Sequence, residues 1–142
     1  MRARPAREFV RPSYPHMGPY ESEIWQRFLL TTDMRFIKID YDVRVGPGYD
    51  PGEQYPENIR KMAIALTQLR IDAVAETPNE IWIFEVKPRA GRSALGQLEA
   101  YGYWYLRQYR PTKLVRLAVV CREVDPNMVE VFRERGIHIF KV

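Results

Sequence analysis

Three charged residues in the middle of the chain, Asp72, Glu85 and Lys87, have the types and the spacing for metal or acid–base chemistry. A tight turn centred on Pro78-Asn79 would pair Asp72 with Glu85 across a hairpin, because proline and asparagine favour those turn positions. Residues two apart on a strand share a face, so Lys87 joins the pair. Two carboxylates on directly opposed residues, with Cβ atoms about 5 Å apart, repel each other unless a cation lies between them.

Mg²⁺, or Mn²⁺ in its place, is the cation that this pair predicts, because it takes oxygen ligands and keeps several waters. Lys87 could then orient such a water or help to deprotonate it. A Glu-x-Lys triplet on a strand is more often a solvated face with an ion pair. Here the opposite face carries Trp82, Phe84 and Val86, which indicates a covered strand where charges are costly unless they are used.

The elements that must position these residues follow from hydrophobic periodicity and turn residues. The predicted strands cover residues 36–45, 69–76, 81–87, 114–121 and 137–142. The predicted helices cover residues 20–30, 93–109 and 127–135. Residues 59–66 have a helical period but also fit an extended run, and we predict a short helix there. Residues 46–56 and 88–92 are predicted loops, the second of them basic, with Ser93 as a helix cap.

Two helical positions bring further polar groups toward the predicted sheet. At 100° per residue, Glu21 falls on the side of its helix that also carries Trp25, whereas Glu23 points to the opposite side. Gln97 shares a helix side with Leu98 and is therefore aimed at the sheet. An equally good account of Gln97 is a polar residue bonded to nearby backbone.

This pattern resembles the PD-(D/E)xK nuclease superfamily over residues 20–142. The matching residues are Asp72, the Glu85-Val86-Lys87 triplet, Glu21 and Gln97. Ile71 stands where the family name expects proline, which is a frequent variation. The resemblance implies an α/β, restriction-endonuclease-like core, in which a central mixed β-sheet is flanked by helices in αβββαβ order with a terminal αβ unit.

The resemblance also implies roles for single residues. Asp72, Glu85 and the backbone carbonyl of Val86 would hold the metal, and Lys87 would position the attacking water. Glu21 would reach the site directly or through water, and Gln97 would take part in it. Candidate phosphate contacts are Arg70, Arg89 and Arg92. The simpler alternative is that these arginines are ordinary solvent-exposed side chains without a ligand.

Composition bounds the remaining possibilities. The chain has 142 residues and a net charge of +4, which fits one domain at residues 20–142 after an Arg- and Pro-rich N-terminal arm at residues 1–19. The arginine and proline content of the arm predicts that it forms no helix or strand. We expect the arm to dock on a partner chain or on the chain's own body. No apolar stretch is long enough to span a membrane, and no secretory signal is apparent, so a cytoplasmic or virion location is expected. One cysteine and two distant histidines disfavour a zinc site.

The expected function is Mg²⁺-dependent hydrolysis of DNA phosphodiesters by an endo- or exonuclease that is structure-specific or indifferent to sequence. DNA processing, recombination or phage head completion would employ such a nuclease. A structural or adaptor protein of a virion-like assembly that kept a nuclease fold is the alternative, favoured by the arm and by the loop at residues 46–56. The costly charge pair counts against that alternative. An RNA-directed nuclease is a third possibility, whereas kinase, dehydrogenase and esterase motifs are absent.

Overall fold

A five-stranded mixed sheet forms the centre of the computed structural model, which describes residues 1–142. In spatial order its strands are β3 (Lys38–Val45), β4 (Leu69–Glu76), β5 (Glu80–Ala90), β6 (Leu114–Val124) and β7 (Ile137–Lys141). The first three are antiparallel, and β5, β6 and β7 are parallel. Helix, three antiparallel strands, helix and parallel strand therefore follow in the predicted order, with one helix and one strand after them.

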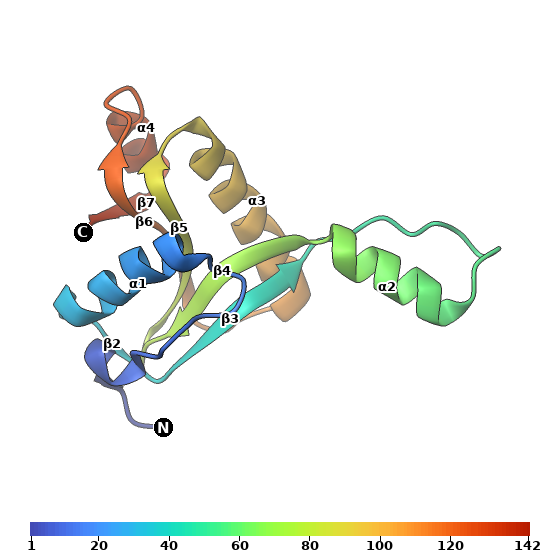
Figure 1. Cartoon of the computed structure of the whole chain (residues 1–142), viewed down its shortest axis with the longest axis horizontal. Coiled ribbons are helices and arrows are strands. Elements are labelled where there is room, and N and C mark those ends of the chain that lie inside the picture. Colours follow the sequence, from blue (N-terminus) through green and yellow to red (C-terminus); the bar gives the residue numbers. More distant parts are fainter.

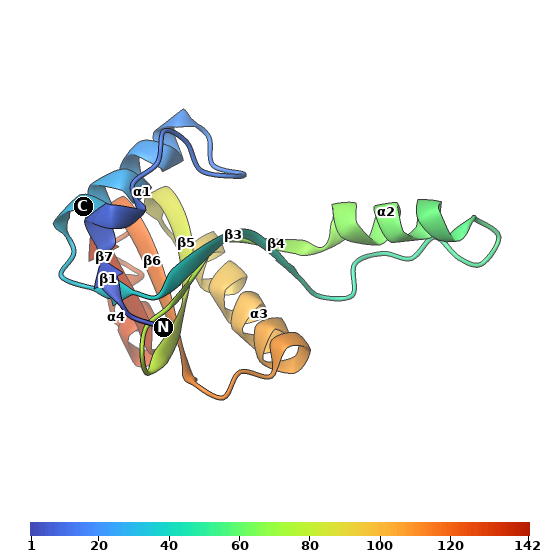
Figure 2. The same cartoon turned by 90° about the horizontal axis from the view of Figure 1, so that it is seen from below.

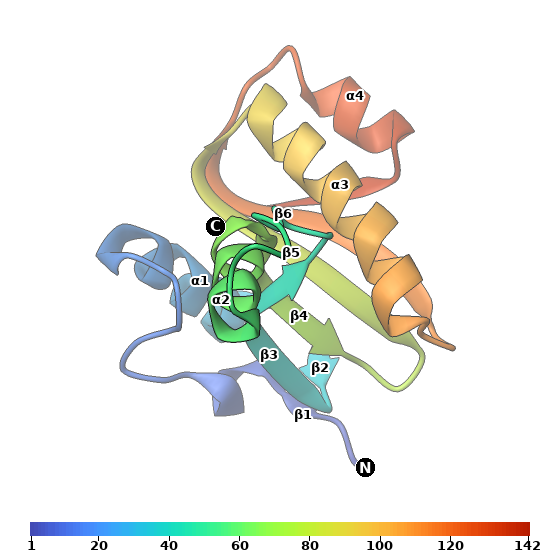
Figure 3. The same cartoon turned by 90° about the vertical axis from the view of Figure 1, so that its right-hand side faces the viewer.

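Helices cover both faces of this sheet (Figures 1 and 3). Helix α1 (Pro19–Thr31) lies on one face, and α3 (Arg92–Tyr109) and α4 (Val129–Glu134) lie on the other. Side chains alternate along β5, so Phe84 packs with α1 while Ile83 packs with α3. This alternation places Glu85 and Lys87 on the α3 side of the sheet.

The predicted hairpin register is confirmed, since Ala73 pairs with Phe84 and Val74 with Ile83. Pairing between β4 and β5 stops at Ala73, although β4 remains paired with β3 as far as Leu69 and β5 remains paired with β6 as far as Ala90. The β3–β4 hairpin thus bends away from β5 (Figure 1). We call this divergence the fork, defined by Asp72 on β4 and residues 85–87 on β5.

The predicted basic loop at residues 88–92 is wrong at its beginning, because β5 continues to Ala90. Proline fits here because residues two apart point to the same side. The Val86 N–H points to the fork, and the Pro88 nitrogen therefore points to the same side. Proline has no N–H to donate, but β4 is not paired with β5 there, so no strand lacks a hydrogen bond. Ser93 is not the helix cap: α3 begins at Arg92 after Gly91, without a side-chain cap.

The N-terminal arm is folded, contrary to the prediction of no helix or strand. Strand β1 (Arg4–Pro5) pairs with β2 (Arg35–Phe36), and the 3-10 turn η1 (Ala6–Phe9) packs against α1. A two-residue pairing needs only a few main-chain groups, so arginine and proline do not prevent it. The arm therefore docks on the chain's own body, which was one of the two predicted alternatives.

Helix α2 (Glu57–Thr67) confirms the predicted helix between β3 and β4, but it projects away from the sheet (Figure 2). None of its residues is buried, and Ile59, Met62 and Leu66 are exposed. The apolar period in this segment therefore does not face the core. No helix of the chain is both long and apolar enough to cross a membrane.

Candidate active site

The fork places the two predicted acidic residues side by side. The Asp72 carboxylate accepts a hydrogen bond from the Val86 backbone N–H at 2.8 Å, replacing the bond that a continued β4–β5 ladder would supply. The N–H and C=O of a strand residue point to the same side, so the Val86 carbonyl is also directed into the fork. Asp72 and the main chain of Val86 thus meet in the fork, next to Glu85 in the sequence.

Glu85 is the one buried charged side chain of the protein, with 5% of its surface exposed. The Tyr101 hydroxyl, from α3, donates a hydrogen bond to Glu85 Oε1 at 3.0 Å. Lys87 Nζ lies 3.6 Å from Glu85 Oε2, and the Lys87 side chain keeps 22% exposure. One carboxylate oxygen is thereby fixed by the protein, while the other faces a lysine that reaches solvent.

Burial strongly disfavours ionisation of this pair. Burial, and then the charge of Asp72, raise the pKa of Glu85 to about 8, although Lys87 and Tyr101 act in the opposite direction. Burial also raises the pKa of Asp72, against the Val86 N–H bond that favours its ionised form. Without a cation, the two carboxyl groups therefore hold a proton between them near neutral pH.

This raised pKa predicts a pH dependence of stability for the metal-free protein. The folded-state pKa of Glu85, about 8, exceeds its ordinary value of 4.5, so the folded chain keeps a proton that the unfolded chain has released between those values. The free energy of unfolding should therefore fall as pH rises through this window. We expect Glu85→Gln to flatten that fall, measured by chemical denaturation at pH 5 and pH 8 with chelator present. An equal fall in wild type and variant would contradict the assignment.

The fork fits a divalent cation such as Mg²⁺ by the chemistry of its donors. Asp72, Glu85 and the Val86 carbonyl supply oxygen, the ligand type that Mg²⁺ prefers. Gln97, on the sheet-facing side of α3, has a buried Oε1 atom without a hydrogen-bond partner, which is rare for a buried polar group. The chain gathers no group of three or more acidic, histidine or cysteine residues, so solvent would have to complete the coordination.

Comparison with known proteins adds one partial likeness. No protein-family model and no curated protein matches the sequence. A repair endonuclease from Pyrococcus abyssi, among solved structures, matches with a TM-score of 0.44 and 19% identity. The match covers 51% of this chain and 32% of the endonuclease, so the chain spans about a third of that protein.

Glu21 is not brought into the fork as a third acidic ligand. It lies in the first turn of α1 and folds back over Gly18, where an added Cβ would be 2.7 Å from Glu21 Oε1. The sequence placed Glu21 on the correct side of the helix, since Trp25 on that side is buried. The helix side alone does not fix the position along the helix axis.

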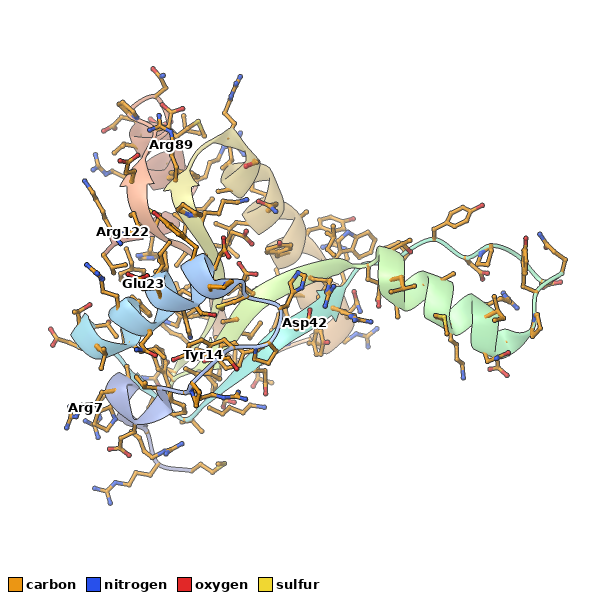
Figure 4. The ribbon with its side chains drawn as sticks, in the orientation of Figure 1. Arg7, Tyr14, Glu23, Asp42, Arg89 and Arg122 are labelled. Carbon is orange, nitrogen blue, oxygen red and sulfur yellow. The ribbon has the colours of Figure 1, made fainter.

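The three candidate phosphate contacts lie in different surroundings. Arg70 makes a two-pronged ion pair with Asp42 of β3, at 2.7 and 2.8 Å. Arg89 lies near the end of β5 (Figure 4), 3.6 Å from Glu123, and is exposed. Arg92 is exposed at the first turn of α3. Arg89 and Arg92 are therefore more accessible to a ligand than Arg70.

Sequence reasoning missed Tyr101 at this site and Asp42 on the neighbouring strand. Tyr101 is not among the predicted site residues, although it lies one helical turn after Gln97 and on the same side. Asp42 has a left-handed backbone, with φ of 53°, at the point where it would face Asp72 across β3 and β4. The spacing of Tyr101 was a usable signal, whereas nothing in the sequence marks Asp42.

Proposed function

We propose that this protein is a metal-dependent nuclease that hydrolyses phosphodiester bonds in DNA, with Mg²⁺ or Mn²⁺ as cofactor. The observation that carries the proposal is the pairing of the buried Glu85 with the half-buried Asp72, fixed at a fork in the sheet beside Lys87. Burying two acidic groups together is costly and brings no structural gain that apolar residues could not supply. A bound divalent cation would remove that cost.

Each residue of the site then has a defined task. Asp72 and Glu85 would hold the cation, which would supply positive charge against the phosphate in the transition state. Tyr101 keeps the Glu85 carboxylate in place through its hydroxyl. Lys87 Nζ would hold the attacking water by a hydrogen bond, and only in its uncharged form would it accept the proton of that water. The Gln97 amide oxygen is available to accept a hydrogen bond from a water or a ligand.

A substrate read by structure rather than by sequence fits this chain best. The fork is formed by the core itself, and base-specific reading of DNA needs side chains that enter a groove. The accessible arginines Arg89 and Arg92 offer contacts to phosphates, which carry no sequence information. We therefore propose cleavage of duplexes, ends or branches without base preference.

A structural or adaptor role explains fewer of these features. The folded conformation of the N-terminal arm is held by contacts within the chain, since Ala6 and Tyr14 are buried against the chain's own body. An outside partner is not needed to explain it. An adaptor also has no use for an ionisable pair in a covered position. The exposed helix α2 is the feature that an adaptor role would explain.

Incubation with supercoiled plasmid tests the proposal. We expect nicked or linear plasmid with Mg²⁺ or Mn²⁺ and intact plasmid when a chelator is added. Parallel incubations with single-stranded DNA, a branched junction and RNA of the same sequence would define the substrate. A protein that leaves every substrate intact with both metals is not a nuclease, and the adaptor alternative would then stand.

A further inference from the structure

Helix α2 has one side that the chain itself covers and one side that it leaves open. On the covered side, the loop before the helix comes so close that a Cβ added at Gly48 would overlap the Ile64 carbonyl oxygen. At 100° per residue, an apolar stripe runs along the opposite side. Its large residues are Ile59, Met62 and Leu66, with 40%, 58% and 70% of their surface exposed. We call this stripe the open side of α2.

The open side carries no charged residue. The charged residues of α2 are Glu57, Arg60 and Lys61, and at 100° per residue all three project away from the stripe. Each of them is paired within the chain. Lys61 Nζ lies 3.1 Å from Glu57 Oε1, and Arg60 donates two hydrogen bonds to Asp50, at 2.6 and 3.0 Å. The open side therefore offers nothing to the phosphates of DNA, and an exposed apolar surface of this kind is typical of a protein–protein contact.

The apolar surface of the whole projecting segment, residues 49–69, is large enough for a specific interface. At about 150 Å² for a fully exposed large side chain, it leaves roughly 500 Å² of apolar surface in solvent. Two such segments together would cover roughly 1,000 Å², which is the lower limit of a specific interface. A helix of 11 residues is also marginal in water on its own, so coverage would stabilise it. The large apolar residues exposed in this segment are Tyr49, Tyr55, Ile59, Met62, Leu66 and Leu69.

We propose that a second copy of this chain covers the open side of α2, as an antiparallel helix pair about a two-fold axis. The stripe is complementary to itself in this arrangement. With the axis between Met62 and Ala63, Ile59 lies opposite Leu66 of the second copy. Met62 then lies opposite Ala63 of the second copy, and a large residue facing a small one lets the helices approach closely.

The place of α2 in the fold favours the antiparallel direction. The helix leads directly into β4, so its C-terminal end lies next to the sheet and its N-terminal end lies at the tip of the projection (Figure 2). Antiparallel pairing puts the two sheets at opposite ends of the helix pair, where they do not collide. It also sets each helix N-terminus beside the C-terminus of the other, which suits the helix dipoles. Such a dimer explains the exposed α2 without an adaptor role.

Sedimentation velocity of the full chain over a range of concentrations tests the inference. We expect a reversible wild-type dimer with a Kd of about 10–100 µM, as suits a small interface. Leu66→Lys should weaken this dimer about 100-fold, because it introduces a charge into the apolar contact at two symmetrical positions. Circular dichroism should show an unchanged helix content, since Leu66 is exposed in the monomer.

The matched control is Leu30→Lys, because Leu30 is a leucine in α1 with 57% exposure. This variant should dimerise like the wild type. A wild-type chain that stays monomeric at about 500 µM overturns the inference, as does a dimer that Leu66→Lys leaves intact.

A mixture of two variants tests the antiparallel arrangement itself. Ile59→Glu and Leu66→Lys should each be monomeric alone at a concentration where the wild type is a dimer. Mixed in equal amounts, they should form a heterodimer, because the introduced glutamate of one chain lies opposite the introduced lysine of the other. A mixture that stays monomeric overturns the proposed antiparallel pair. No DNA or metal enters these measurements, so their outcome is separate from the test of the proposed nuclease function.

Discussion

The Asp72→Asn variant is expected to lose metal-dependent nicking of plasmid DNA by about 10³-fold, the upper end of what one electrostatic contact to a transition state contributes. Asparagine keeps an oxygen that can accept the Val86 N–H, so the fork retains its shape. The charge available to the cation falls by one. Glu85 ionises more readily in this variant, because the charge of Asp72 helps to raise its pKa.

Stability separates this loss from misfolding. Removing the half-buried acidic group beside the buried Glu85 should leave the metal-free variant as stable as the wild type or more so, measured by thermal unfolding at pH 8. Mn²⁺ binding, measured by calorimetry, should weaken in the same variant. The matched control is Asp33→Asn, an exposed acid at the end of α1 without an ion pair. Wild-type nicking by Asp72→Asn would remove Asp72 from the site.

The sequence predicted much of the fork because its main parts depend on strand periodicity and on one turn. Pro78-Asn79 sets the hairpin register, which ends at the pair Ala73–Phe84 and so makes Asp72 and Glu85 the next residues on the two strands. The side shared by Glu85 and Lys87 follows from the two-residue period of a strand. These are local rules that need no knowledge of the rest of the chain.

The remainder depends on tertiary geometry that local patterns do not encode. The separation of β5 from the part of β4 that precedes Ala73 is a property of the whole sheet, and so is the extension of β5 past Pro88 beside β6, where a loop was predicted. The apolar stripe of α2 has a helical period whether it faces a core or solvent. Likewise, the composition of the arm does not reveal that Tyr14 would be buried against the body of the chain.

Lys87→Ala is expected to separate metal binding from cleavage. Lys87 Nζ lies 3.6 Å from Glu85 Oε2, so it competes with a cation for that carboxylate. Its removal should leave Mn²⁺ affinity unchanged or tighter at pH 9, where the pair can ionise. Nicking should nevertheless fall about 10²-fold, because the group that holds the water and accepts its proton is gone.

Lys87→Arg decides between charge and proton transfer as the contribution of this residue. Arginine keeps a positive charge at the fork but does not give up a proton in the physiological range. We therefore expect Lys87→Arg to bind DNA like the wild type and to cleave it as slowly as Lys87→Ala. The control is Lys141→Ala, an exposed lysine at the end of β7. Full cleavage by Lys87→Arg would show that positive charge alone is required and that the attacking water loses its proton to another base.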